Sequence, residues 1–278
     1  MLRAFFFPVF QDKYYFNPHI GTDMDLANFT KRNNVYIPVS AAPDPGFAKL
    51  YLALRDKEQR VYSNEELSKL PDIAPTHTHY REWLIRKASS DKFRAWLTAK
   101  QRPLRILEVG CGNGWFSHQL AAIPQAEVTA LDVNIVELEQ GAAVFSDRNL
   151  RFVYGDLRDG VLAGSRFDII FFAASIAYFP SLAEIVRVAL QHLTPAGELH
   201  IIDTFFYTEN ELPAARQRSL DYYTRMGFPE MAAHYYHFRL EDLRGFNYKV
   251  LQGNNAFMQK LFRTARKFHW ICIRPGPQ

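Results

Sequence analysis

The sequence has little cysteine. Its 278 residues include two, Cys111 and Cys272, which lie far apart in the chain. Two isolated cysteines do not make a disulfide framework or a cysteine-based zinc cluster, and they fit a reducing compartment. We therefore predict no metal site. Cys111 lies in a glycine-rich stretch, where it is interpreted as a small residue that fits a turn rather than as a nucleophile.

The sequence also lacks a long hydrophobic run. No segment approaches the roughly 20 apolar residues of a membrane helix. The apolar N-terminus, Met1 to Pro8, is short, and the polar residues Gln11, Asp12 and Lys13 follow it without a clear small-residue cleavage site. A signal peptide is therefore not expected. We expect a cytoplasmic protein with no membrane partner, and we make no prediction of its oligomeric state.

Neither sign of charge is strongly in excess. The formal net charge is +4, which is mildly basic and argues against a dedicated nucleic-acid binder. Hydrophobic residues make up 48% of the chain, enough for a sizeable core and too many for long disorder. The length suits one large domain, or one domain with an extension.

The stretch from Leu104 to Ser117 is the most informative part of the sequence. An apolar run that ends in Glu108 and Val109 predicts a buried strand, and glycines follow at positions 110, 112 and 114. The next residues, 115–123, predict a helix. A strand, a tight glycine turn and a helix N-terminus make a site where a ligand can approach the backbone and its free N–H donors. A dinucleotide fold requires G-x-G-x-x-G, and here the third glycine comes one residue early.

Strands and helices alternate after this stretch, which predicts a parallel sheet. Further strands are expected at 126–131, 150–154, 167–172 and 198–203, and a final pair at 246–251 and 268–273. Helices are expected at 135–146, 182–193, 210–226, 239–244 and 255–267. Before the glycine stretch we expect irregular structure over 1–47 with one short strand at 35–37, and then helices at 47–58, 63–67, 76–87 and 90–99.

Three acidic residues follow successive predicted strands. Ligands bind at the carboxyl ends of strands in open α/β sheets, so Glu108, Asp132 and Asp156 are candidate ligand groups. Each has a plainer interpretation. Glu108 could cap a loop or helix, Asp132 could cap the helix that begins at Ile135, and Asp156 could be an ordinary turn aspartate.

Together, the E-x-G-x-G-x-G stretch and the later acids resemble the class I S-adenosylmethionine (SAM) methyltransferases. The resemblance covers about residues 104–203 and, more loosely, the last two strands. It implies an α/β fold, a Rossmann-like, seven-stranded, mostly parallel sheet with helices on both faces, whose last strand is antiparallel. An N-terminal helical extension, residues 1–100, would precede a SAM-binding domain, residues 101–278, with a lid insertion at 204–245.

The resemblance also implies the roles of individual residues in holding SAM. Glu108 would hold the ammonium group of the cofactor, Asp132 its ribose hydroxyls and Asp156 its adenine amino group. The segment from Ala173 to Tyr178 would line the cofactor's methionine and the reacting centre. The full predicted cofactor site consists of Glu108, Gly110, Cys111, Gly112, Asn113, Gly114, Asp132, Val133, Asn134, Gly155, Asp156, Leu157, Ala173, Ala174, Ser175 and Tyr178.

The acceptor site is less defined. Candidates for a general base are His79, Tyr80, His234 and His237, although a lone histidine is more often a satisfied core or surface residue. His200, in the middle of a predicted strand, is interpreted as a core residue. The insertion 204–245 is rich in aromatic residues and nearly neutral, which favours a cavity for a small acceptor molecule. We expect this cavity between residues 77–86, 173–178 and 204–240, with the helix at 79–86 covering the cofactor.

Two alternatives stay open. An RNA methyltransferase would use a basic stretch interleaved with aromatic residues, which comprises Lys260, Arg263, Arg266, Lys267 and Arg274. The same stretch is also interpreted as a solvated amphipathic helix. A SAM-binding or NAD-binding module without transfer activity is the second alternative, although the glycine spacing argues against NAD.

Overall fold

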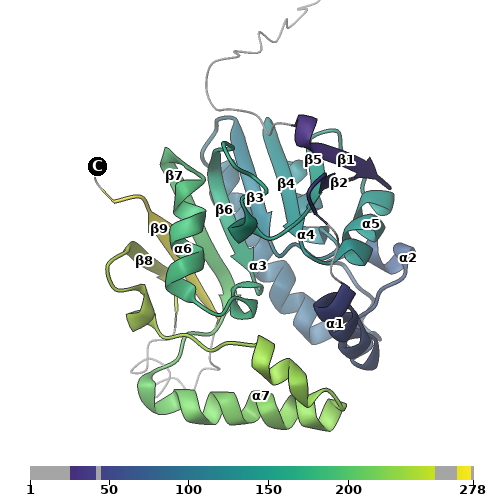
Figure 1. Ribbon diagram of the computed structural model, residues 1–278, viewed down its shortest axis with the longest axis vertical. Coiled ribbons are helices and arrows are strands. Elements are labelled where there is room, and N and C mark those ends of the chain that lie inside the picture. The colour runs from purple at the N-terminus through teal and green to yellow at the C-terminus, as the bar shows by residue number, and fades with distance from the viewer. Residues whose placement is uncertain (1–25, 42–44, 254–267, 277–278) are drawn as a thin grey trace, which may run out of the picture.

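The computed structural model describes residues 26–41, 45–253 and 268–276. One sheet runs through it in the order β1-β2-β5-β4-β3-β6-β7-β9-β8 (Figure 1). Its strands are β1 (Phe29–Arg32), β2 (Val35–Pro38), β3 (Leu104–Val109), β4 (Ala126–Asp132), β5 (Leu150–Tyr154), β6 (Phe167–Ala173), β7 (Leu193–Thr204), β8 (Asn247–Gln252) and β9 (His269–Arg274).

The centre of the sheet is parallel. Strands β5, β4, β3, β6 and β7 pair side by side in the same direction. The chain therefore moves outward from β3 to β5 and then crosses back to place β6 on the other side of β3. This reversal creates a crevice at the carboxyl ends of β3 and β6, where open α/β sheets bind their ligands.

The two edges of the sheet are antiparallel. β9 lies between β7 and β8 and runs antiparallel to both, which confirms the expected antiparallel last strand. The prediction of seven strands is wrong, because β1 and β2 form a hairpin that pairs with β5 at the opposite edge. Asn33 and Asn34 both have positive φ in the two-residue turn of this hairpin, and Val35 and Ile37 are buried in the strand predicted at 35–37.

Helices cover both faces of the sheet (Figure 1). One face packs against α3, α4 and α5, and the other packs against α6. Side chains alternate along each strand, so Ile106 of β3 belongs to the first layer and Leu107 to the second. The helices are α1 (Pro45–Lys57), α2 (Asn64–Leu67), α3 (Tyr80–Thr98), α4 (Trp115–Ala121), α5 (Ile135–Val144), α6 (Leu182–Gln191) and α7 (Leu212–Met226).

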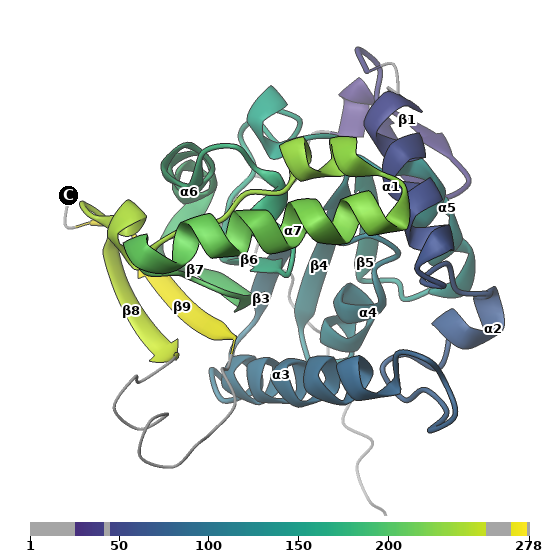
Figure 2. The same ribbon diagram turned by 90° about the horizontal axis from the view of Figure 1, so that it is seen from below.

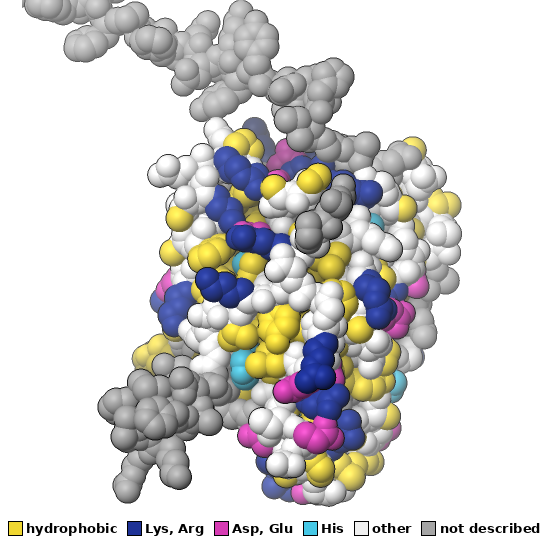
Figure 3. Space-filling view, turned by 90° about the vertical axis from the view of Figure 1, so that its left-hand side faces the viewer, with side chains coloured by type: hydrophobic (Ala, Val, Ile, Leu, Met, Phe, Trp, Pro, Cys, Tyr) yellow, Lys and Arg dark blue, Asp and Glu magenta, His cyan; other side chains and the backbone are white. Residues whose placement is uncertain are grey.

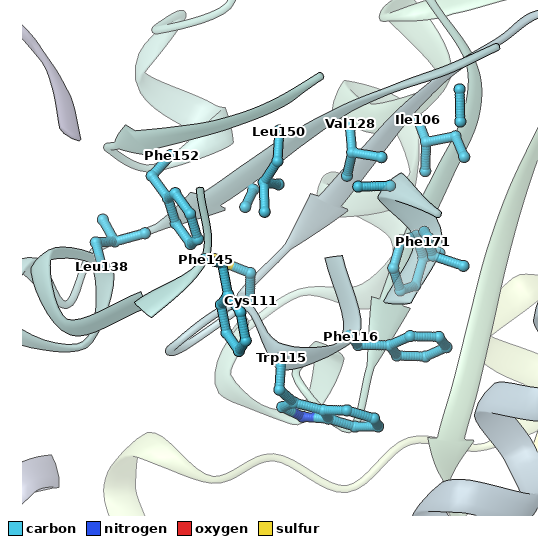
Figure 4. Packing of buried hydrophobic residues seen from close by; sticks show 14 of the residues in the cluster. Ile106, Cys111, Trp115, Phe116, Val128, Leu138, Phe145, Leu150, Phe152 and Phe171 are labelled. Carbon is cyan, nitrogen blue, oxygen red and sulfur yellow. The ribbon is translucent and has the colours of Figure 1, made fainter. Parts of the chain in front are cut away.

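Large aromatic side chains fill the layer beneath the glycine loop. Trp115 stacks on Phe116, with ring centroids 5.1 Å apart, and Phe116 meets Phe171 of β6 edge to face (Figure 4). Phe152 of β5 also points into this layer in Figure 4. The start of α4 is thereby fixed against the sheet.

The prediction of two helices over 76–87 and 90–99 is wrong, because α3 is continuous from Tyr80 to Thr98. Ser89 and Ser90 donate their hydroxyl protons to the carbonyls of Arg86 and Lys87, within the helix, and so do not end it. The helix predicted at 239–244 is a 3-10 turn, Leu240–Leu243. The helix predicted at 255–267 lies outside the described residues.

The segments outside the central fold meet at the carboxyl end of the sheet. α7 lies across the strands, with α1 beside one of its ends (Figure 2). Leu54 of α1 packs in one buried cluster with Tyr223 of α7 and with Met231. Tyr236 donates its backbone N–H to the carbonyl of Ala177 at 2.7 Å, which ties the insertion to the loop after β6.

Candidate functional site

The glycine loop after β3 adopts a backbone conformation that favours glycine. Gly110, Gly112 and Gly114 have φ values of +74°, +57° and +71°. A Cβ atom at Gly110 would lie 2.5 Å from Cβ of Ser175, and one at Gly114 would lie 2.4 Å from the ring of Phe152. The loop therefore needs these glycines both for their conformation and for close contact with β5 and with the segment after β6.

Asp132, at the end of β4, holds the glycine loop in place. Its Oδ2 accepts the backbone N–H of Gly112 and its Oδ1 accepts that of Asn134, both at 2.7 Å. The N-cap of α5 is Asn134, whose Oδ1 accepts from Val136 N and Glu137 N. Asp132 is thus not the helix cap, and one of its interpretations is set aside. Burial raises the pKa of Asp132 in spite of its N–H partners.

Glu108 is 3% exposed, at the end of β3. Its Oε2 accepts the hydroxyl proton of Ser117 on α4 at 2.6 Å. Burial raises the pKa of this carboxyl to about 8. A carboxyl in this state gains from a cationic partner, which would stabilise its ionised form.

A third acid, the half-buried Glu137, was missed by the sequence analysis. It lies in the first turn of α5, accepts the side-chain N–H of Asn134 at 3.1 Å, and has a pKa raised by burial to about 7. Its carboxylate would lie 3.5 Å from a Cβ at Gly112. An acid in a helix's first turn usually interacts with the helix dipole at the surface, so the sequence carries no sign of this burial.

Asp156 lies two residues after the end of β5 and caps the 3-10 turn Leu157–Asp159, where it accepts the backbone N–H of Arg158 at 2.9 Å. The guanidinium of Arg158 also pairs with it, with Nη2 and Oδ2 2.6 Å apart. Part of its hydrogen-bonding capacity is therefore used within the turn, as expected for an ordinary turn aspartate. Asp156 nonetheless lines the cavity described next.

A cavity of about 1020 Å³ opens at the carboxyl ends of β3, β4, β5 and β6. All the predicted cofactor residues line it except Gly114, which faces Phe152. It also has walls from the three predicted segments 77–86, 173–178 and 204–240, through Glu82, Trp83, Arg86, the Ala173–Ser175 stretch, Tyr178, His234 and Tyr236. One cavity thus lies between the three predicted segments, and α1 contributes a further wall that the sequence did not predict.

One of the four candidate bases lines the cavity, and the other three do not. His234 lines it, and its ring lies 5.2 Å from that of Phe47. Tyr80 is not part of the lining, and neither are His79, whose Nε2 lies 2.7 Å from the carbonyl of Glu58, and His237, whose Nε2 lies 2.9 Å from the hydroxyl of Ser219. The three candidate histidines therefore do not converge on one point.

Arginines also line the cavity, on the side that α3 forms. Arg60 donates two hydrogen bonds to Glu82, at 2.7 and 2.6 Å, and Arg86 donates from Nε to the same carboxylate at 2.9 Å. These cations lower the pKa of Glu82 to about 2, against the effect of burial. On the same helix, Trp83 meets Trp115 edge to face at 5.1 Å, which places α3 beside the start of α4.

Among the described residues, one group could offer metal ligands, and it lies away from this cavity. It consists of Glu198, His200 and Cys272, all buried. Glu198 already accepts from Lys100 Nζ and Arg274 Nη2, each at 2.7 Å. Two cations thus neutralise the carboxylate, and the group is a buried polar network in which His200 is the expected core residue.

The fold and the site define a class. A parallel sheet with an antiparallel last strand, an acid and a glycine loop after β3, and further acids after β4 and β5 are the features of a Rossmann-like class I methyltransferase domain. Residues 106–197, about a third of the chain, match the family described as a methyltransferase domain. The resemblance to class I SAM-dependent methyltransferases is thereby confirmed for this part of the chain.

Similar proteins agree with this class. A malonyl-[acyl-carrier protein] O-methyltransferase of Halalkalibacterium halodurans is 31% identical over 46% of this chain and 53% of its own length. A trans-aconitate 2-methyltransferase of Deinococcus radiodurans is 34% identical over 36% of this chain and 38% of its own. The chain therefore spans about half or less of the length of these relatives.

A solved structure shows the same fold. The YcgJ protein of Bacillus subtilis matches 66% of this chain and 98% of its own with a TM-score of 0.50 at 14% identity. Among the described residues of the present chain, no helix is both long and apolar enough to cross a membrane.

Proposed function

We propose that this chain is a SAM-dependent methyltransferase that acts on a small molecule. The observation that carries the proposal is the set of three carboxyl groups around the glycine loop in one cavity, the buried Glu108 and the half-buried Asp132 and Glu137. The names of the relatives, which are methyltransferases, support the same activity.

The residues present fit this cofactor. Burial raises the pKa of all three carboxyls, so their ionised forms are stabilised by a ligand that brings a positive charge or hydroxyl donors. SAM carries a sulfonium, an ammonium and two ribose hydroxyls. An anionic dinucleotide would place phosphate charges beside these same acids, which disfavours NAD.

When bound, the cofactor supplies an electrophilic methyl group, and the chain's own residues bind, orient and exclude water. Glu108 would take the ammonium, Asp132 the ribose, and Asp156 the adenine. Ser175 is held by donating its hydroxyl proton to the carbonyl of Val109 at 2.5 Å, so the segment after β6 keeps a fixed wall at the reacting centre.

Arg60 and Arg86 suit the carboxylate of the cofactor's methionine. They share Glu82, and Trp83 between them in sequence packs beside the start of α4, next to the glycine loop. Guanidinium groups bind carboxylates through paired N–H donors. On this assignment α3 covers the methionine end of the cofactor, as the sequence predicted for the helix at 79–86.

A small acceptor is favoured over RNA. The basic stretch from Lys260 to Lys267 lies outside the described residues, and Arg274 pairs with Glu198. On the face shown in Figure 3, Lys and Arg side chains lie in separate groups, interrupted by hydrophobic and acidic ones. Nucleic-acid binders gather such charges in a continuous patch.

The division of the chain at residue 100, with a lid at 204–245, stays part of this proposal. Its support is the position of α7 and of the turn Pro229–His234 over the carboxyl end of the sheet (Figure 2). His234 and Tyr236 line the cavity from this insertion.

Calorimetric titration with S-adenosylhomocysteine (SAH), the demethylated product, tests the proposed function. We expect micromolar binding by the wild-type protein and no detectable NAD binding. The Asp132→Ala variant loses a charged hydrogen-bond acceptor, so its affinity should fall by about 1.5–3 kcal/mol. Unchanged SAH affinity in this variant would refute the ribose assignment, and absence of SAH binding by the wild type would refute the function.

A further inference from the structure

Arg55 of α1 occupies a different part of the cavity from Arg60 and Arg86. Its guanidinium lies 4.7 Å above the ring of Tyr51, and its Nη2 donates to the hydroxyl oxygen of Tyr178 at 3.3 Å. Tyr178 comes three residues after Ser175, in the turn that follows β6. Arg55 is therefore directed at the predicted reacting centre.

The carboxylate next to Arg55, that of Glu58, also has other polar partners. Glu58 accepts from Arg55 Nη1 at 2.8 Å, lies 3.2 Å from Arg60 Nε, and also accepts the hydroxyl proton of Tyr222. Glu58 does not line the cavity, whereas Arg55 does. A guanidinium has five N–H donors, more than Glu58 and Tyr178 use.

Arginines outnumber carboxylates in the ion pairs along this wall. Three guanidinium groups, those of Arg55, Arg60 and Arg86, pair with two carboxylates, Glu58 and Glu82. Asp203 bonds to Ser89 and lies outside the lining, whereas Glu137 lines the cavity, where burial raises its pKa and Arg55 acts against this rise. Because Arg60 and Arg86 are assigned to the cofactor's carboxylate, Arg55 is the guanidinium left for a negative group of the acceptor.

Aromatic side chains enclose the same place. Phe47 contacts the rings of Tyr51, Tyr178 and His234, Tyr51 also contacts Tyr178, and all four line the cavity. Burial raises the pKa of Tyr51, so its hydroxyl stays a neutral donor at physiological pH. An ionic contact in such an enclosed site is stronger than one in water.

We propose that Arg55 and Tyr178 form a recognition site for a carboxylate group on the methyl acceptor, an inference that rests on the proposed function. The hydroxyl oxygen of Tyr178 accepts from Arg55, so the hydroxyl proton of Tyr178 can be donated to a ligand. A planar carboxylate can accept from the guanidinium and from this hydroxyl together. The aromatic wall then takes the apolar remainder of the acid.

Calorimetry on the protein saturated with SAH tests the site with matched pairs of acid and amide. The probes are benzoate with benzamide, phenylacetate with phenylacetamide, and hexanoate with hexanamide, and phenyl phosphate serves as a dianion. We expect at least one acid to bind tenfold or more tightly than its amide. The preference should fall below twofold in Arg55→Gln and by about threefold in Tyr178→Phe, which keeps the ring.

Lys49→Gln is the matched control, because it removes a positive charge from an exposed position on the same helix. It should keep the full preference for the acid. The proposal is overturned when SAH binds but no acid binds better than its amide, when the preference survives in Arg55→Gln, or when phenyl phosphate binds more tightly than every acid. An intact acid preference without any SAH binding would instead refute the proposed function and keep the site.

Should Arg55→Gln fail to fold, the Tyr178→Phe variant decides the matter. Its acid preference, measured at saturating SAH, must fall about threefold. An unchanged preference in a folded Tyr178→Phe protein counts against the proposal.

Discussion

The two halves of the cavity are built in different ways. The glycine-loop half comes from short runs of consecutive residues at the ends of β3, β4, β5 and β6. The opposite half takes single side chains from α1, α3 and the insertion, which are far apart in sequence. The first half can be formed by local turns on a parallel sheet, whereas the second exists only once α1, α3 and α7 have packed.

The halves also differ in charge. Acids whose pKa values are raised gather at the glycine loop, and arginines line the walls from α1 and α3. A ligand with separated positive and negative groups can satisfy both sides. SAM is such a ligand, so a change to Arg86 on α3 should weaken SAH binding, whereas a change to Arg55 on α1 should leave it largely unaffected.

The largest expected effect comes from breaking the rigid half at Gly110. Gly110→Ala puts a Cβ 2.5 Å from Ser175 in a left-handed conformation, so strain and overpacking add. We expect urea denaturation to show a free energy of unfolding that is lower by about 3 kcal/mol or more. Gly160→Ala is the control, because Gly160 has a similar φ of +70° with nothing within 4 Å, and it should cost only about 1 kcal/mol. Equal costs would show that the contact with Ser175 has no influence.

A smaller effect should follow a change on the arginine side. Arg86→Gln removes one of two guanidinium groups proposed to hold the cofactor's carboxylate, while Arg60 stays. We expect SAH affinity to fall about tenfold, or about 1.4 kcal/mol, by calorimetry. Arg81→Gln, an exposed arginine on the same helix, should bind as the wild type does. If both variants bind SAH normally, α3 does not contact the methionine carboxylate.

The smallest effect concerns protons. The pKa of Glu108 is raised to about 8, so the folded protein binds this proton more tightly than the unfolded chain does. Its contribution to stability therefore falls as pH rises from about 4.5 to about 8. The ammonium of SAH would lower this pKa, and binding near pH 7 should release up to about one proton. Calorimetry in two buffers of different ionisation enthalpy measures the release, which Glu108→Gln should reduce.

Absence of proton release in the wild type would mean that Glu108 does not meet the ammonium. Glu137 has a pKa of about 7 and contributes to the same signal, so Glu137→Gln is measured beside Glu108→Gln. The two variants together separate the contributions of the acids.

The sequence predicted the half of the site that depends on local pattern. The glycine spacing and the acids after each strand placed all but one of the predicted cofactor residues in the cavity. It missed Glu137 because helix position alone does not reveal burial. It missed Arg55 because α1 meets the site through contacts with residues far away in the sequence, such as Tyr178 and Tyr223. Only the second strand of the hairpin β1–β2 was predicted, because the turn before it depends on the left-handed backbone of Asn33 and Asn34.

One comparison tests the central claim, that a single cavity holds the cofactor beside the glycine loop and α3 and the acceptor beside Arg55 of α1. SAH affinity is measured by calorimetry for the wild type, Asp132→Ala and Arg55→Gln under one set of conditions. The account predicts a loss of about tenfold or more in Asp132→Ala and a change of less than twofold in Arg55→Gln. Equal losses in both variants, or an unchanged affinity in Asp132→Ala, would contradict it.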